Sequence, residues 1–367
     1  MSSAFENLSR PKPPKRIGFL FEKAFSKESL YQAFIQARKG KRKKVECFEF
    51  ESRLGSEIDD LYESLHNGTY QPQPLRTFEV FEPKRRVIHA PYFRDLVVQH
   101  AVYKVIYPIF NRGFIDQNYA CRKGGGTHKA SDYAQRAMRK YSGDLYYAKL
   151  DIKKFFYSIG HAVLRELIER KIKDKRFISV MLSFLGSDKV GIPIGNLLSQ
   201  VYALLVLNPL DHFAKRVLKI KHYVRYMDDF VAIGLTLEQA KRFKTACEQF
   251  VNERLKLRLS HWTINKLKRG LNFVGYRTWR SIKFVRKHSV TKFKRLCKRL
   301  KIESITSLLG HAAHSASIVF FTHYLQSHGL LQLLHKRTLT LCLAILRTHQ
   351  PKRNLQPCAL ATPARMN

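Results

Sequence analysis

The residues of this chain best suited to chemistry are three aspartates in two separate stretches. Asp228 and Asp229 interrupt a run of apolar and aromatic residues over 223–234, which predicts a β-hairpin with both carboxylates at its tip. Asp151 closes a second strand-like run that begins at residue 145. Adjacent carboxylates repel each other, and we expect no local cation to neutralise the hairpin pair. A divalent metal such as Mg²⁺, which takes oxygen ligands, would do so.

An isolated Asp-Asp pair is more often a polar turn, because Asp is a favoured turn residue. The second acidic stretch changes this interpretation, since one carboxylate at a strand end and two on a neighbouring hairpin can converge on two metal ions. Two metals about 3.5–4 Å apart are a standard arrangement for in-line phosphoryl displacement. The two stretches together therefore predict two-metal phosphoryl transfer by Asp151, Asp228 and Asp229.

The charge of the chain indicates the class of its partner. Its 367 residues include 67 Lys and Arg against 28 Asp and Glu, and this net charge of +39 predicts a polyanion, above all nucleic acid. The basic residues are spread through every segment, whereas a membrane-surface protein would gather them on one amphipathic helix. We expect no membrane span, because no apolar run approaches the roughly 20 residues required, and no signal peptide.

The remaining patterns favour a cytoplasmic protein of mixed helices and strands. The six cysteines are scattered without a C-x-x-C pair, which indicates reduced thiols rather than a zinc site or a disulfide framework. Two strands are expected over 78–81 and 86–88, and a second hairpin over 271–276. Apolar periodicity predicts helices over residues 20–37, 50–65, 94–110, 128–140, 161–171, 201–213, 236–251 and 289–301.

The motifs at the acidic stretches resemble those of reverse transcriptases. Residues 226–229 read Tyr-Met-Asp-Asp and, with Asp151 upstream, look like the catalytic core of that family. Between them lie Ile194-Gly195 and Ser199-Gln200, where most reverse transcriptases have Gln-Gly and Ser-Pro. This variant is similar to the reverse transcriptases of diversity-generating retroelements. Three further stretches resemble the same group: residues 86–91, 94–101 and 119–128.

The resemblance, which covers most of the chain, implies an α+β fold. This is a right-hand polymerase with fingers, a palm of antiparallel sheet plus helices, and a helical thumb. The expected divisions are a basic N-terminal extension over 1–45, fingers over 46–144, palm over 145–281 with part of the fingers around 165–190, thumb over 282–349, and a flexible tail over 350–367.

The reaction implied by the resemblance is RNA-templated DNA synthesis, in which a primer 3′-hydroxyl attacks the α-phosphate of a dNTP and displaces pyrophosphate. Asp151 and Asp228 would hold two Mg²⁺ ions, one at the hydroxyl and one at the triphosphate. Asp229 would support that pair, and the carbonyl of Ile152 would complete a metal shell. Two lysines within residues 266–268 are candidate proton donors to the pyrophosphate.

A nucleotide site follows from the same resemblance. Arg86, with Lys84 as a weaker candidate, would contact the triphosphate from the fingers, because an Arg fork matches phosphate oxygens. Phe156 stands where an aromatic ring excludes a 2′-hydroxyl and so favours deoxynucleotides. Ile194, followed by Gly195, replaces a glutamine that helps to fix the base pair. An apolar side chain there would loosen base selection, and copying in the resembled group is error-prone at template adenines.

The partners implied for such an enzyme are a structured template-repeat RNA, the RNA/cDNA duplex, dNTPs and a small basic accessory variability protein, in a bacterial or phage-encoded, cytoplasmic setting. We therefore expect adenine-mutagenised cDNA made for targeted protein diversification. Two alternatives stay open. Ile194 and Gln200 argue against a faithful group II intron-type or stand-alone reverse transcriptase. The complete set of three aspartates argues against an inactive palm that only binds RNA.

Overall fold

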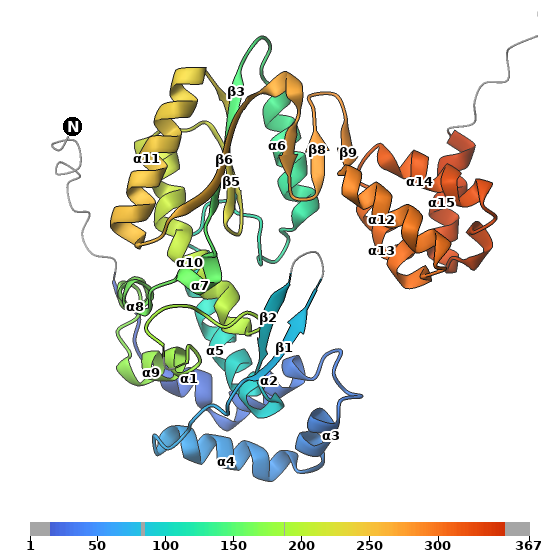
Figure 1. Ribbon diagram of the computed structural model, residues 1–367. Coiled ribbons are helices and arrows are strands. Elements are labelled where there is room, and N and C mark those ends of the chain that lie inside the picture. The colour runs from blue at the N-terminus through green and yellow to red at the C-terminus, as the bar shows by residue number, and fades with distance from the viewer. Residues whose placement is uncertain (1–14, 82–84, 187, 349–367) are drawn as a thin grey trace, which may run out of the picture. The chain divides into compact units, whose positions relative to one another are not determined.

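A computed structural model describes residues 15–81, 85–186 and 188–348 (Figure 1). The chain forms two compact units, the first ending at Arg269 and the second beginning at Gly270. Both units combine helices with antiparallel sheet, so the expected α+β class is confirmed. Three expectations lie wholly or partly outside the described residues, and they concern the first 14 residues of the basic extension expected over 1–45, Lys84, and the tail expected over 350–367.

The N-terminal helices of the first unit pack around α5 (Phe93–Asn111), which buries apolar side chains along its length. The segment expected as one or two helices forms α1 (Leu20–Phe25) and α2 (Lys27–Ala37). The helix expected over 50–65 is divided into α3 (Val45–Ser52) and α4 (Leu54–His66), because the backbone at the intervening residue leaves the helical conformation (φ −118°, ψ 30°).

A four-stranded antiparallel sheet forms the centre of the first unit. Its order is β4 (His222–Tyr226), β5 (Asp229–Leu235), β3 (Tyr146–Ile152) and β6 (Leu259–Lys266). β3 thus lies between two strands that follow it in the sequence. The helices that pack on this sheet are α6 (Thr127–Arg139), on β4 and β5, and α11 (Leu237–Leu255), on β3, β5 and β6.

The first unit also contains a β-hairpin and four further helices. The hairpin is antiparallel and consists of β1 (Arg76–Val80) and β2 (Arg86–Ala90). The helices are α7 (Phe155–Ser158), α8 (His161–Glu169), α9 (Lys175–Ser183) and α10 (Leu197–His212). α10 begins four residues before the expected start, because the Asn196 side chain caps it by accepting the N–H of Leu198 at 3.0 Å.

The second unit is a three-stranded antiparallel sheet followed by helices. The strands are β7 (Leu271–Phe273), β8 (Tyr276–Thr278) and β9 (Lys283–Val285). The helices are α12 (Lys287–Lys298), α13 (Ile302–Ala312), α14 (Ser317–Ser327) and α15 (Lys336–Thr348). The stacked rings of Phe293 and Phe321, 3.9 Å apart, lie in its core. The hairpin expected over 271–276 therefore belongs to this unit, and the finer domain boundaries stay predictions.

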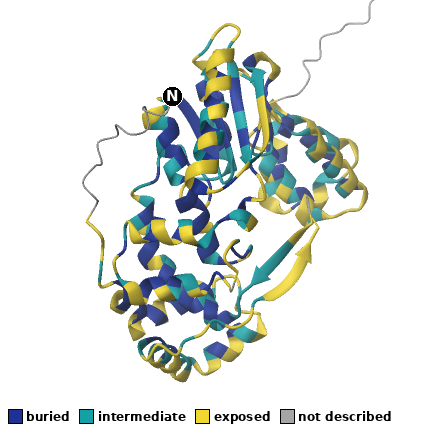
Figure 2. Ribbon diagram, turned by 60° about the vertical axis from the view of Figure 1, so that its left-hand side comes forward, coloured by how far each residue is buried: buried dark blue, intermediate teal, exposed yellow. Residues whose placement is uncertain are grey.

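Burial follows these layers. Figure 2 shows β5 and the neighbouring part of the central sheet as buried, whereas β1 is exposed along its whole length. α10 is buried over most of its turns, which explains its nearly continuous apolar sequence. Within residues 15–348, apart from the few positions left undescribed, none of the helices is long and apolar enough to cross a membrane.

Candidate active site

The hairpin predicted around the acidic pair is present, formed by β4 and β5. Tyr226 pairs with Asp229, which leaves Met227 and Asp228 as a two-residue turn. Met227 has a left-handed backbone (φ 55°), an uncommon conformation for a residue other than glycine. Asp228 therefore lies at the tip, as predicted, but Asp229 is already the first residue of β5.

Strand pairing brings Asp151 to the same place. Leu150 of β3 pairs with Phe230 of β5, so that Asp151 and Asp229 adjoin this pair at the same end of the sheet. The negative charge of Asp151 raises the pKa of both hairpin carboxyls. The convergence of the three aspartates could be predicted only as a hypothesis, because nothing local in the sequence determines that β3 pairs with β5.

Asp229 has a cationic partner that the sequence analysis did not foresee. Lys149 Nζ lies 3.0 Å from Asp229 Oδ2, so the expectation of no local cation is wrong. The cation comes from the neighbouring strand, on the same face as Asp151 because the two are two residues apart. Burial raises the pKa of Asp229 to about 6 in spite of this lysine. Oδ1 of Asp229 is buried and finds no hydrogen-bond partner within the described part of the chain.

Asp228 experiences a different balance. Burial and then the charge of Asp151 raise its pKa, while the positive charges of Arg86 and Arg225 act in the opposite direction. Arg86 is the first residue of β2, and its effect on Asp228 shows that this candidate phosphate ligand lies within electrostatic range of the acidic site. Ser260 of β6 donates its hydroxyl to Asp151 Oδ1 at 3.2 Å and orients that carboxylate from the other side.

The donor set suits a hard divalent cation. The negative charge of Asp151 disfavours the ionised form of Asp228, and a cation would offset this effect and provide a partner for the buried Oδ1 of Asp229. Within the described ranges, no three His, Cys, Asp or Glu side chains are grouped to hold a metal ion. Lys149 pairs with Asp229, and a metal role for Asp229 beside Asp151 and Asp228 stays a prediction. The side chain of Ile152 is buried, and a metal role for its carbonyl stays a prediction.

Of the predicted nucleotide residues, Ile194 and Gly195 lie on a loop that is joined to β2, and Phe156 of α7 contacts the same loop. The carbonyl of Phe156 accepts the N–H of Ile192 at 2.8 Å, and the carbonyl of Ile194 accepts the N–H of His89 at 2.6 Å. Gly195 has φ 109°, and a Cβ there would lie 2.8 Å from Ile88 Cγ2, so only glycine fits without displacement. These contacts fix α7, residues 192–195 and β2 together, and the nucleotide roles stay predictions.

Two buried residues, Arg225 and Asp211, support the Met227–Asp228 turn and were missed in the sequence analysis. Arg225 donates to both carboxylate oxygens of Asp211 and to the carbonyl of Met227. Asp211 is the only acidic residue of α10, and this lone charge in an apolar helix was the available signal.

Lys266 and Lys268 do not lie beside the acidic site. Both pair with Asp144, at 2.7 and 3.0 Å, and Lys266 is aligned with Tyr146 at the opposite end of β3 from Asp151. Five strand residues separate these ends by about 17 Å at roughly 3.3 Å per residue. This placement argues against both candidates as the proton donor to pyrophosphate.

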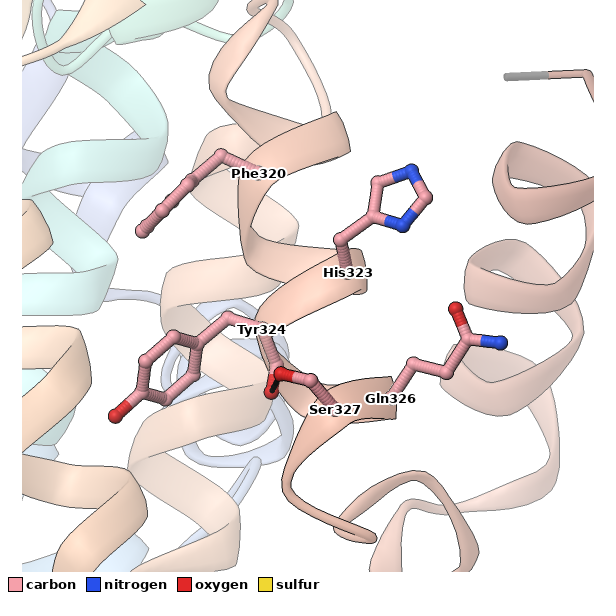
Figure 3. Close-up of a pocket in the computed structure, with 5 residues that line it drawn as sticks. All are labelled: Phe320, His323, Tyr324, Gln326 and Ser327. Atoms are coloured by element: carbon pink, nitrogen blue, oxygen red, sulfur yellow. Dashed lines mark hydrogen bonds between the residues drawn. The ribbon is translucent and has the colours of Figure 1, made fainter. Parts of the chain in front are cut away.

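Neither of two sizeable cavities is lined by Asp151, Asp228 or Asp229. A cavity of about 1200 Å³ in the first unit is lined by residues of α8, α10 and the loop after α5. Another, of about 400 Å³, lies on α14 (Figure 3). In that view Phe320 and Tyr324 point to one side of the helix, and His323 and Gln326 to the other. Lys294 Nζ lies over both aromatic rings, at 5.4 and 5.7 Å, which makes this face cationic and aromatic rather than acidic.

The family of the chain follows from sequence comparison. The family model described as "Reverse transcriptase (RNA-dependent DNA polymerase)" matches residues 82–278, more than half of the chain. The chain therefore belongs to the reverse transcriptase family, as the residues at both acidic stretches indicated.

Individual relatives include a group II intron-encoded protein and a second bacterial protein. The group II intron-encoded protein LtrA of Lactococcus lactis subsp. cremoris is 30% identical over 177 residues, which cover 45% of this chain and 28% of LtrA. Protein YkfC of Escherichia coli (strain K12) is 25% identical over 281 residues, 62% of this chain and 72% of YkfC. The chain thus spans less than a third of LtrA. Among solved structures, telomerase from Candida albicans, in complex with a fragment of telomeric RNA, matches with a TM-score of 0.47 at 12% identity over 76% of this chain and 58% of that one.

Proposed function

We propose that this chain catalyses RNA-templated DNA synthesis at the Asp151–Asp228 pair. The observation that carries this proposal is the placement of Asp151, on β3, beside the turn that carries Asp228 and leads into the neighbouring strand β5, with the charges of Asp151 and Arg86 both acting on Asp228. Membership of the reverse transcriptase family supports the same reaction. The substrates of such a reaction are a dNTP, a primer 3′-hydroxyl and an RNA template.

Each side chain of the site would have a separate role in this reaction. Bound Mg²⁺ would supply activation of the primer hydroxyl and neutralisation of phosphate charge. Asp151 and Asp228 would provide its oxygen ligands, with Asp229 and the carbonyl of Ile152 as further candidates. Arg86 would bind the triphosphate. Phe156, held beside the 192–195 loop by its carbonyl, would exclude a ribose 2′-hydroxyl with its ring.

Nucleic acid would be held largely through phosphate contacts. Glu303 is the only acidic residue from position 270 to the end of the sequence, so the second unit is strongly basic. α12 has an apolar face that includes buried Phe293 and Cys297, and its Lys and Arg residues lie around the other face. We therefore assign the thumb to residues 282–349, the palm to 145–281 and the fingers to 46–144, as part of this proposal.

Our finer proposal is that the chain is a diversity-generating reverse transcriptase that makes adenine-mutagenised cDNA. It would copy a template-repeat RNA together with an accessory variability protein. The support is Ile194, an apolar side chain in the loop that adjoins β2. The competing proposal is a faithful group II intron-type enzyme, which the 30% identity to LtrA favours.

The acidic site is tested by Asp228→Asn in primer extension on a defined RNA template with Mg²⁺ and dNTPs, together with RNA binding. We expect synthesis to be lost and RNA affinity to change by less than about twofold, since a single carboxylate charge is small beside many phosphate contacts. Asp144→Asn, which alters an aspartate at the far end of β3, is the control and should remain active. Synthesis by the Asp228→Asn protein would overturn the site assignment.

The class is tested by sequencing the cDNA, with and without a candidate accessory protein. Errors concentrated at template adenines, and reduced by Ile194→Gln, would support the diversity-generating proposal. Accurate cDNA from the unaltered protein would overturn it in favour of the intron-type enzyme. Cys121→Ser is the matched control, because Cys121 is exposed and lies outside the 192–195 loop.

A further inference from the structure

A buried ion pair lies directly beneath the turn that carries Asp228. The side chains of Arg225 and Asp211 are both completely buried. Arg225 Nε lies 2.7 Å from Asp211 Oδ1 and Nη2 lies 2.6 Å from Oδ2, which is a two-pronged arrangement. The hydroxyl of Tyr223 donates to the same Asp211 Oδ1 at 2.9 Å.

The remaining guanidinium nitrogen reaches the turn itself. Arg225 Nη1 donates to the carbonyl of Met227 at 2.9 Å. Arg225 is fixed by its backbone as well, because its N–H donates to the carbonyl of Gln117 and its carbonyl accepts the N–H of Tyr119. The guanidinium therefore links α10 to the left-handed residue that precedes Asp228.

Stability alone does not account for this pair. Replacing a buried ion pair by apolar residues of similar volume is often neutral or even stabilising. An apolar pair, however, would have no donor for the Met227 carbonyl and would leave the Met227–Asp228 turn without this support. The specific contribution of Arg225 is thus geometric, and its charge also acts on Asp228.

We propose that Arg225, held by Asp211, is a positioning residue that sets the direction of the Asp228 carboxylate toward Asp151. The inference rests on the proposed polymerase function for its catalytic consequence, but not for its structural one. Asp211 orients the guanidinium, the guanidinium fixes the Met227 carbonyl, and the turn then holds Asp228 at the end of the sheet.

The test is the double variant Arg225→Met with Asp211→Asn, which leaves no unpaired buried charge and keeps an oxygen acceptor for Tyr223. We expect kcat for primer extension to fall about a hundredfold, with KM for dNTP and RNA affinity within about threefold, as for loss of an interaction specific to the transition state. Arg225→Lys keeps the charge without the planar fork and should give an intermediate kcat. Tyr202→Phe, which removes another buried hydrogen bond of α10, is the control and should retain kcat.

Hydrogen–deuterium exchange of the peptide over residues 223–230 gives a readout that does not require activity. The double variant should lose protection at the turn, while peptides from α10 exchange as in the unaltered protein. Unchanged kcat or unchanged protection of the turn in the double variant would overturn the positioning role. Absence of synthesis by the unaltered protein would instead contradict the proposed function, and the exchange result would still decide whether Arg225 fixes the turn.

Discussion

Lys149 and Asp229 form an ion pair across two neighbouring strands at the acidic end of the central sheet. Their side chains retain only 22% and 20% of their exposure, and Nζ lies 3.0 Å from Oδ2. One of the three aspartates is therefore paired with a cation of the protein itself, whereas Asp228 is subject to the negative charge of Asp151. In the proposed function, Asp151 and Asp228 are therefore the principal metal ligands, and Asp229 supports them.

Replacement of Lys149 should destabilise the fold, because Asp229 would then be a largely buried carboxylate without a cationic partner. We expect Lys149→Met to lower the free energy of unfolding by about 1–3 kcal/mol, because a largely buried carboxylate loses its partner. Adding Asp229→Asn should recover part of this loss, with a coupling energy of about 1 kcal/mol in a double-mutant cycle measured by urea unfolding. Additive effects of the two substitutions would show that the pair does not stabilise the fold.

Gly195 should be sensitive to a single added methyl group. Gly195 has a φ of 109°, and a Cβ added there would lie 2.8 Å from Ile88 Cγ2. We therefore expect Gly195→Ala to displace the loop from β2. We expect kcat/KM for dNTP to fall at least about tenfold in steady-state primer extension. Gly186→Ala is the matched control, since that glycine also has positive φ (89°) but an added Cβ would meet nothing within 4 Å. Equal losses in both variants would assign the effect to backbone strain alone.

Phe156 should control the choice of sugar. Truncation by Phe156→Ala would open the space that a ribose 2′-hydroxyl requires, and we expect discrimination against ribonucleotides to fall about tenfold or more. The measurement compares kcat/KM for dNTP and rNTP on one template. Tyr157→Ala alters the adjacent, exposed ring and should leave the ratio unchanged. An unchanged ratio of kcat/KM for dNTP and rNTP in Phe156→Ala would mean that another group discriminates against the 2′-hydroxyl.

His100 of α5 should make stability depend on pH. Burial, with the charges of Lys41 and Lys39, lowers the pKa of His100 to about 4. The unfolded chain, with an ordinary histidine pKa, therefore gains a proton first as the pH falls, and stability is lost between about pH 6.5 and pH 4. The loss between about pH 7 and pH 5 is about 2 kcal/mol. Urea unfolding at both values should show it, and His100→Gln should remove that part of the dependence.

Local patterns predicted the elements that carry the candidate chemistry. The apolar run around Asp228 and Asp229 encoded a hairpin, and the residues at 236–239 encoded a helix start that forms the capping box found at α11. Such features depend on strand propensity, helical periodicity and turn chemistry within a few residues, which a single stretch of sequence contains. The family of the chain, read from the same stretches, is likewise a local property of its motifs.

The tertiary structure alone decided which of these elements meet. β3 lies between β5 and β6, and this placement gives Asp229 its lysine and puts Lys266 at the wrong end of the sheet for catalysis. The fork of Arg225 reaches Asp211 on a separate helix. Pairings of this kind depend on the packing of the whole unit, because burying a charge is tolerated only where distant segments supply its partner. No local pattern in the sequence specifies that partner.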